Sequence, residues 1–105
     1  MSREILARLH GINLDLLPVL YELLRTRSVT VTARSFNMTQ PAASRALRQL
    51  RLAFRDELLV SLGREARLTE RAESLLEPLA RAMQDLDLLL KPAGGFDPAT
   101  DARRT

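Results

Sequence analysis

Residues 39–48 decide the fold, and they read Thr-Gln-Pro-Ala-Ala-Ser-Arg-Ala-Leu-Arg. Thr39 is a favourable helix N-cap, and Pro41 fits the first helical turn, where its missing N–H costs little. In a helix the rest of the stretch places Ser44 and Arg45 on one face and small apolar residues on the other. The sequence therefore predicts a helix from Gln40 to Phe54 with an apolar base and a polar, basic outer face.

A shorter helix is expected just upstream, from about Thr30 to Asn37. Its N-cap is either Ser28 or Thr30, and Asn37 can adopt the left-handed conformation that ends a helix. The β-branched residues 29–32 favour a strand, but the segment is short and runs into helix-forming residues. Two helices joined by such a turn form a helix-turn-helix, in which the second helix reads the DNA major groove.

The flanking segments complete a small helical core. Residues 2–10 either form a short helix or stay loose, and Asn13 is expected to cap a helix that runs to about Thr26. The leucines from Leu14 to Leu24 recur at helical spacing, which predicts a buried stripe. After the predicted recognition helix, residues 58–62 and 66–68 read as two short strands around a turn, with Arg64 at the tip of this hairpin.

Thr69 is expected to cap a long helix over residues 70–91. The apolar residues of this helix alternate by four and three positions, which is a heptad seam suited to pairing two helices. The fold class is thus mainly α: a winged helix-turn-helix at 13–69 (three helices plus a β-hairpin wing) followed by a dimerisation helix at 70–91. An N-terminal extension (1–12) and a hinge or tail (92–105) flank them. The predicted dimerisation residues are Ala72, Leu76, Leu79, Met83, Leu86 and Leu90.

Composition narrows the function. The 105 residues contain 46% hydrophobic but only 4% aromatic residues, which favours an aliphatic helical core. There is no cysteine and a single histidine, His10, so we expect no disulfide, metal site or cofactor. No paired carboxylates, nucleophile–base set or phosphate loop is evident, so we expect no enzyme. No apolar run reaches the length of a membrane span, and we expect a cytoplasmic, nucleoid-associated protein.

Charge is unevenly distributed along the chain. Between Arg25 and Arg71 ten arginines face four acids, a net charge of +6, whereas residues 72–101 carry two basic and six acidic residues, a net charge of −4. A basic middle followed by an acidic helix suits a module with one side facing a polyanion, although a solvated charged surface explains the charge alone equally well.

These residues resemble the N-terminal DNA-binding region of LysR-type transcriptional regulators, over Asn13 to about Leu90. The motif at 39–47 carries the resemblance, together with Ser28-Val29-Thr30, Leu50-Arg51 and the wing. Residues 96–100 (Phe-Asp-Pro-Ala-Thr) resemble the hinge of the branch that includes nodulation regulators. In this family a domain that senses a small molecule follows the hinge. The chain stops where that domain would begin, so we expect an excised region or a natural short form, with an effector only for the missing domain.

The resemblance also implies site residues and partners. It implies a homodimer on a pseudo-palindromic promoter site in double-stranded DNA, with Arg64 in the minor groove. Three departures lower the expected affinity: Ser61 replaces a wing arginine, Glu57 and Leu59 replace a proline and a phenylalanine, and Val31-Thr32 replaces a basic residue and an alanine. The residues implied to contact DNA are Thr30, Thr39, Gln40, Pro41, Ser44, Arg45, Arg48 and Arg64.

Two functions follow from the sequence. The first is a sequence-specific DNA-binding regulator of transcription without catalysis. The alternative is an interaction protein that pairs through residues 72–90 with a full-length relative and inhibits it. A nonspecific nucleoid or RNA-binding role is weaker, because the chain lacks lysine-rich tails and stacking aromatics.

Overall fold

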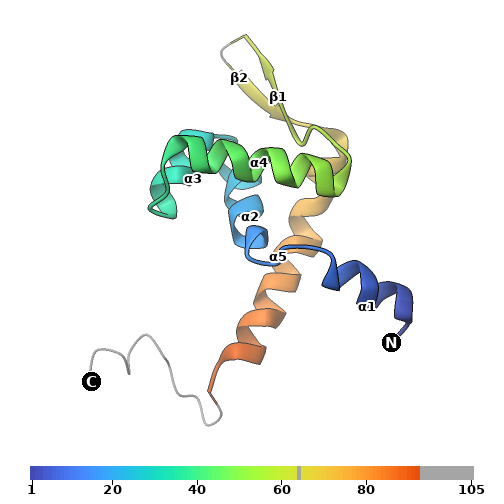
Figure 1. Ribbon diagram of the computed structural model, residues 1–105. Coiled ribbons are helices and arrows are strands. Elements are labelled where there is room, and N and C mark those ends of the chain that lie inside the picture. Colours follow the sequence, from blue (N-terminus) through green and yellow to red (C-terminus); the bar gives the residue numbers. More distant parts are fainter. Residues whose placement is uncertain (64, 93–105) are drawn as a thin grey trace, which may run out of the picture.

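The computed structural model describes residues 1–63 and 65–92. Helices α2, α3 and α4 form a bundle, a two-stranded hairpin projects from it, and α5 descends from the base of the hairpin along α2 (Figure 1). The elements are α1 (Arg3–His10), α2 (Leu16–Thr26), α3 (Val29–Ser35), α4 (Gln40–Phe54), β1 (Leu59–Leu62), β2 (Glu65–Leu68) and α5 (Glu70–Leu90). This is the predicted mainly helical, winged helix-turn-helix fold.

Four helices begin at hydroxyl side chains. Ser2, Ser28, Thr39 and Thr69 have extended backbones, and each side chain accepts a hydrogen bond from the amide three residues on, which satisfies a free donor of the first turn. Ser28, rather than Thr30, is thus the cap of α3. Left-handed residues follow the helices: Arg27 after α2, Asn37 after α3 and Arg55 after α4, with φ of 56°, 55° and 52°. These stops turn the chain sharply and keep the three helices close together.

The predicted start of α2 was wrong by two residues. Asn13 does not cap the helix; its Oδ1 accepts a hydrogen bond from the Asp15 amide, 3.1 Å away, in a local turn. A second turn, from the Leu16 amide to the Asn13 carbonyl, delays the helix to Leu16. As a consequence Leu14 is 45% exposed and is not part of the core. Residues 3–10 form α1, the helical one of the two alternatives.

The core lies where α2 meets α4 and α5. Leu20, Leu23 and Leu24 of α2 are almost fully buried, as are Leu50 of α4 and Ala72 of α5. At about 25 cal/mol per Å² of apolar surface, this burial is the main stabilising contribution. The complete cluster contains Val19, Leu20, Leu23, Leu24, Ala46, Leu47, Leu50, Leu58, Leu59, Ala72 and Leu79.

The predicted heptad seam of α5 is buried in its first half and exposed in its second half. Ala72 is fully buried and Leu79 is 8% exposed, because both pack on the rest of their own chain. Leu76 packs against the same cluster, whereas Leu86 and Leu90 are 38% and 76% exposed. The first half of the seam therefore completes the domain core, and only its second half remains accessible to another chain. Ala72 and Leu79, predicted as dimerisation residues, are thus covered by their own chain.

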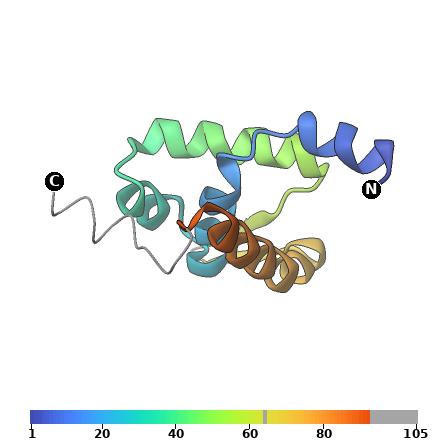
Figure 2. The ribbon, with the colours of Figure 1, turned by 90° about the horizontal axis from the view of Figure 1, so that it is seen from below.

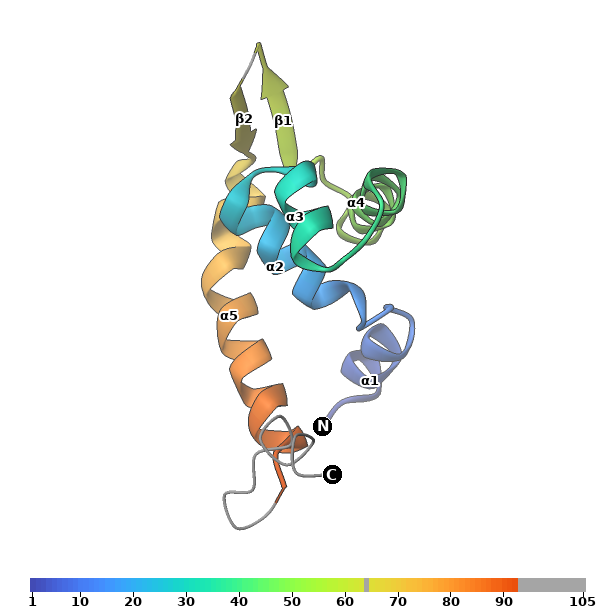
Figure 3. The same cartoon turned by 90° about the vertical axis from the view of Figure 1, so that its left-hand side faces the viewer.

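The wing is a regular antiparallel hairpin. Leu59 pairs with Leu68 and Val60 with Arg67, and Leu59 reaches into the core from the base of β1. Viewed from the side, the hairpin extends beyond the helices, with α4 on one side of the molecule and α5 on the other (Figure 3). Among the described residues, no helix has the length and apolarity required to cross a membrane.

Candidate nucleic-acid interface

The outer face of α4 is the centre of the candidate site. Thr39 caps this helix, and its Oγ1 accepts a hydrogen bond from the Ala42 amide at 3.2 Å. The opposite face is buried through Ala43, Ala46, Leu47 and Leu50, which fixes the orientation of the helix. Six of the predicted DNA contacts are accordingly exposed on this element: Thr39, Gln40, Pro41, Ser44, Arg45 and Arg48.

Arg45 and Arg48 have no carboxylate partner, unlike several other arginines of the described residues. Arg25, Arg67 and Arg81 each lie within 4 Å of a carboxylate on their own element. Within the described residues neither Arg45 nor Arg48 forms an ion pair. Their positive charge is therefore uncompensated on an exposed helix face, and a guanidinium in this state can bind phosphate or the acceptor edge of guanine.

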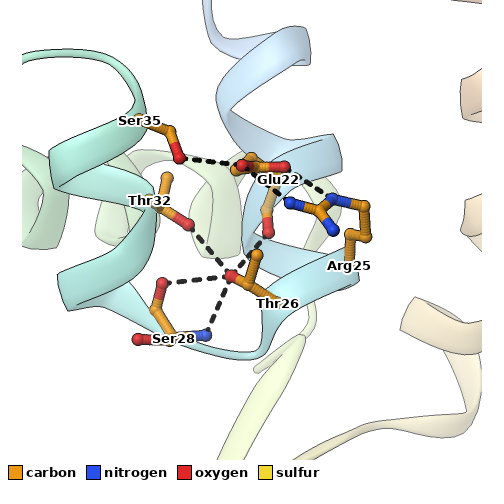
Figure 4. Close-up of polar contacts among 6 residues, drawn as sticks. All are labelled: Glu22, Arg25, Thr26, Ser28, Thr32 and Ser35. Atoms are coloured by element: carbon orange, nitrogen blue, oxygen red, sulfur yellow. Dashed lines mark hydrogen bonds and ion pairs between the residues drawn. The ribbon is translucent and has the colours of Figure 1, made fainter.

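A polar network joins α2 to α3 and supports the helix-turn-helix (Figure 4). The Glu22 carboxylate accepts hydrogen bonds from Arg25 Nε at 2.8 Å and from Ser35 Oγ at 2.8 Å. These bonds, from Arg25 first and then Ser35, lower the pKa of Glu22. Glu22 therefore stays ionised and holds the end of α3 against α2.

A second part of this network is buried (Figure 4). Thr32 is fully buried, and its hydroxyl lies 3.3 Å from the hydroxyl of Thr26. The Thr26 hydroxyl also donates to the Glu22 carbonyl at 2.8 Å and accepts from the Ser28 amide at 3.2 Å. A buried hydroxyl is tolerated only when it is hydrogen-bonded, so the bond with Thr26 allows Thr32 to be buried in the core. Sequence reasoning missed this network, although the three-residue spacing of Glu22 and Arg25 is a signal for an ion pair on a helix.

Arg51 of α4 is hydrogen-bonded to the base of the wing. Its Nε donates to the Glu57 carbonyl at 2.7 Å, and its Nη2 donates to the Leu59 carbonyl at 2.9 Å. The side chain thus joins α4 to the segment that enters β1. Two backbone carbonyls of the wing base therefore occupy donors of Arg51.

Asp56 holds the other side of the wing base. Its Oδ2 accepts hydrogen bonds from the Thr69 hydroxyl and the Leu58 amide, and these two bonds, in that order, lower the pKa of Asp56. The Thr69 amide in turn donates to the Leu58 carbonyl at 3.0 Å. Leu58 is held with φ of 65°, a conformation that is unusual for leucine, while its side chain is fully buried. The wing is therefore anchored at its base to both α4 and α5.

Thr30, another predicted contact, is exposed in the first turn of α3. Arg67 and Ser61, which were not among the predicted contacts, are exposed on the wing. Arg64, predicted at the wing tip, lies outside the described residues. His10 is exposed at the end of α1, and among residues 1–63 and 65–92 no three potential metal ligands form a group.

Comparison with known proteins matches this geometry to one family. Residues 14–73 match the model of the bacterial regulatory helix-turn-helix proteins of the lysR family. Nodulation protein D 2 of Bradyrhizobium sp. (strain NC92) is 43% identical over 97 residues, which are 92% of this chain and 29% of that protein. Nodulation protein D 3 of Rhizobium leguminosarum bv. phaseoli is 44% identical over 91 residues, or 87% of this chain and 30% of that one. The chain thus spans under a third of the length of these relatives.

Solved structures agree with the fold. A probable transcriptional regulator from Pseudomonas aeruginosa superimposes with a TM-score of 0.74 at 34% identity, over 81% of this chain and 28% of that one. The BenM DBD in complex with catB site 1 DNA gives a TM-score of 0.68 at 19% identity, over 75% of this chain and 85% of that one. Residues 96–100 predicted the branch of the family that includes nodulation regulators, and the similarity to nodulation proteins agrees with this prediction. These residues lie outside the described part of the chain.

Proposed function

The chain belongs to the LysR family of bacterial regulatory helix-turn-helix proteins, and from this premise we propose that it recognises a specific promoter sequence in double-stranded DNA. The observation that carries the proposal is the exposed face of α4, where Arg45 and Arg48 have no ionic partner among the described residues. A rigid helix with an apolar base and free arginines on its outer face fits the major groove.

Individual roles follow from position and chemistry. Gln40, Ser44 and Arg45 lie on the first two turns of α4, where a recognition helix contacts base edges. Pro41 would supply an apolar contact, and Arg48 would bind a base edge or a phosphate. Thr30 and Thr39, at the N-terminal ends of α3 and α4, would contact phosphates of the DNA backbone, because helix N-termini favour anions. Arg64 would enter the minor groove from the wing.

We further propose that the chain acts as a dimer on a pseudo-palindromic site. Leu86, Leu89 and Leu90 of α5 are 38%, 77% and 76% exposed, and burying them against a second copy would remove apolar surface from water. A two-fold dimer places two α4 helices on half-sites separated by about one helical turn of DNA or a multiple of it. The proposed interface residues are Met83, Leu86, Leu89 and Leu90.

Arg45→Ala tests the reading helix. We expect it to weaken binding to the selected sequence roughly tenfold or more, because a bidentate arginine–guanine pair gives about 1–3 kcal/mol of discrimination. Binding to random DNA should fall much less. Titration of labelled cognate and random duplexes by fluorescence anisotropy at one salt concentration measures both losses.

Arg81→Ala is the matched control for this variant. It removes the same charge from α5, where Arg81 pairs with Glu77 at 2.8 Å, and should leave the ratio of cognate to random affinity unchanged. Equal losses on cognate and random DNA for Arg45→Ala would contradict sequence reading by α4.

The cognate sequence itself comes from selection out of a random DNA pool with the purified chain. A dyad-symmetric consensus supports a dimeric regulator. The alternative, an inhibitor that pairs with a full-length relative, predicts no enrichment by this chain alone and subunit exchange with that relative.

A further inference from the structure

Helix α1 has an apolar face that the described part of its own chain does not cover. Ile5, Leu6 and Leu9 share one side of this helix and are 41%, 53% and 47% exposed, and no residue of α1 is buried. An eight-residue helix is not expected to be stable in water without tertiary contacts. Its leucines and isoleucine therefore require a surface to pack against.

A second uncovered apolar surface lies at the same end of the molecule. A groove of about 470 Å³ runs between the start of α2 and the last turns of α5. Next to it on α5, Leu89 is 77% exposed. The wing lies toward one end of α2, and both α1 and this half of α5 lie toward the other end (Figures 1 and 3). The residues that line the groove are Leu14, Asp15, Leu17, Pro18, Met83, Leu86, Asp87 and Leu90.

The two surfaces are also complementary in charge. Helix α1 carries two arginines against one glutamate, a net charge of +1, and the apolar face is bordered by Arg8 on one side and Arg3 on the other. Helix α5 carries five carboxylates against two arginines, a net charge of −3. Bringing two such α5 helices together in a dimer is electrostatically unfavourable, and a basic helix laid on them offsets that repulsion.

The link between α1 and α2 directs α1 away from its own α5. The Gly11 and Ile12 amides close the end of α1 onto Ala7 and Leu9, and the Leu16 and Leu17 amides close the next turn onto Asn13 and Leu14. These turns leave only the junction between Ile12 and Asn13 without such a bond. Seen from below, α1 extends from the molecule at the end of α4 and away from α5 (Figure 2).

We propose that α1 is a dimerisation arm: in the dimer, the Ile5, Leu6 and Leu9 face of each copy packs on the last two turns of α5 of the second copy. A second copy of the chain thus covers the exposed α5 surface with both its α5 and its α1. This inference rests on the dimer proposed above, and it adds an element that lies before the residues 14–73 matched by the family model.

Chemical cross-linking tests the arm directly, because the chain contains no cysteine. Leu6→Cys is mixed with a size-tagged chain carrying Leu89→Cys, and a short bismaleimide is added. The arm predicts a product that joins one untagged and one tagged chain. Ala7→Cys, on the other side of α1, and Leu88→Cys, about 100° around α5 from Leu89, are the matched controls and should give much less product.

A double variant, Leu6→Ser with Leu9→Ser, tests the energetic contribution. We expect its dimer dissociation constant, measured by analytical ultracentrifugation, to rise at least about tenfold, because two leucines lose their buried contacts. Its melting temperature at a concentration where both proteins are monomeric should stay close to the wild type. Ala7→Ser is the control that should leave the dissociation constant unchanged.

The outcomes separate the arm from the dimer. A wild-type chain that stays monomeric at every concentration overturns the dimer itself, and the arm with it. A stable dimer that gives no mixed product above the controls, with an unchanged dissociation constant in the double variant, overturns the arm alone. A chain carrying both cysteines that links only within itself overturns the arm as well, because α1 then packs on its own α5.

Discussion

Asp56 is the residue through which the wing and the last helix are joined. One carboxylate oxygen accepts the Thr69 hydroxyl, which belongs to the cap of α5, and the Leu58 amide, which begins the path into β1. These bonds favour the ionised form, so the pKa of Asp56 is lower in the folded chain than in the unfolded one.

This shift predicts a pH dependence of stability. A carboxylate whose pKa is lowered on folding stabilises the fold above the unfolded value of about 4, and that stabilisation is lost as the pH falls through the lower folded value. We therefore expect Asp56→Asn to lower the melting temperature at neutral pH and the difference from wild type to shrink in the acid range. Thermal unfolding followed by circular dichroism between neutral pH and acid measures this. Asp85→Asn, a charge-matched change on exposed α5, is the control; a difference for Asp56→Asn that does not vary with pH would contradict the role.

Single residues also show what sequence could and could not predict. The exposure of Arg45 and Arg48 was predictable, because helical periodicity alone assigns them to the side opposite the buried alanines. The bonds of Arg51 were not, because its partners are backbone carbonyls of Glu57 and Leu59, which only the completed wing brings within reach. The same holds for Thr32, whose partner Thr26 belongs to another helix.

Among the elements, the wing depends on α4 for its position. Arg51 donates two hydrogen bonds across this junction, and its side chain is 37% exposed. We expect Arg51→Ala to destabilise the fold by about 1–2 kcal/mol, since charge-assisted hydrogen bonds contribute more than neutral ones but are weakened by partial exposure. Urea unfolding measures the change, and Arg51→Lys should restore only part of it.

Arg48→Ala is the matched control for Arg51. It removes an exposed arginine of the same helix that has no ionic partner among the described residues, so stability should change by no more than about 0.5 kcal/mol. Equal destabilisation by the two variants would refute the role of Arg51 at the wing base.

Element boundaries were predictable where a cap is encoded locally. Helix α4 begins and ends where the sequence predicted, because Thr39 and Pro41 specify its start. The start of α2 was missed because Asn13 uses its side chain for a turn instead of a cap, and these two uses look alike in sequence. Periodicity predicted the apolar seam of α5, but it cannot say which chain covers the seam. The core of the same chain buries Ala72 and Leu79.

At the scale of the whole molecule, charge and shape divide the chain into two ends. Helix α4, with its arginines, lies on one side of the molecule, and α5, with its excess of carboxylates, lies on the other (Figure 3). The proposed DNA-facing side should therefore dominate the salt dependence of binding.

A salt titration tests this division. If Arg48 contacts a phosphate, Arg48→Ala should reduce the slope of log affinity against log salt by about 0.9. Arg81→Ala, on α5, should leave the slope unchanged. Fluorescence anisotropy at several salt concentrations gives the slopes, and a reduction of the same size in both variants would mean that the net charge alone, and not its placement, governs binding.

Thr69 gives the molecule one further property. Its hydroxyl bonds to both Asp56 and the Ala72 amide, and its backbone amide bonds to Leu58, so no hinge separates the wing from the helix proposed to dimerise. Two such units joined through α5 would hold their two α4 helices at a fixed separation and orientation. An extra base pair between the half-sites rotates one of them by about 34–36° around the duplex. The strain of that mismatch would then fall on the DNA, which must twist or bend, and promoter spacing would be read as strictly as promoter sequence.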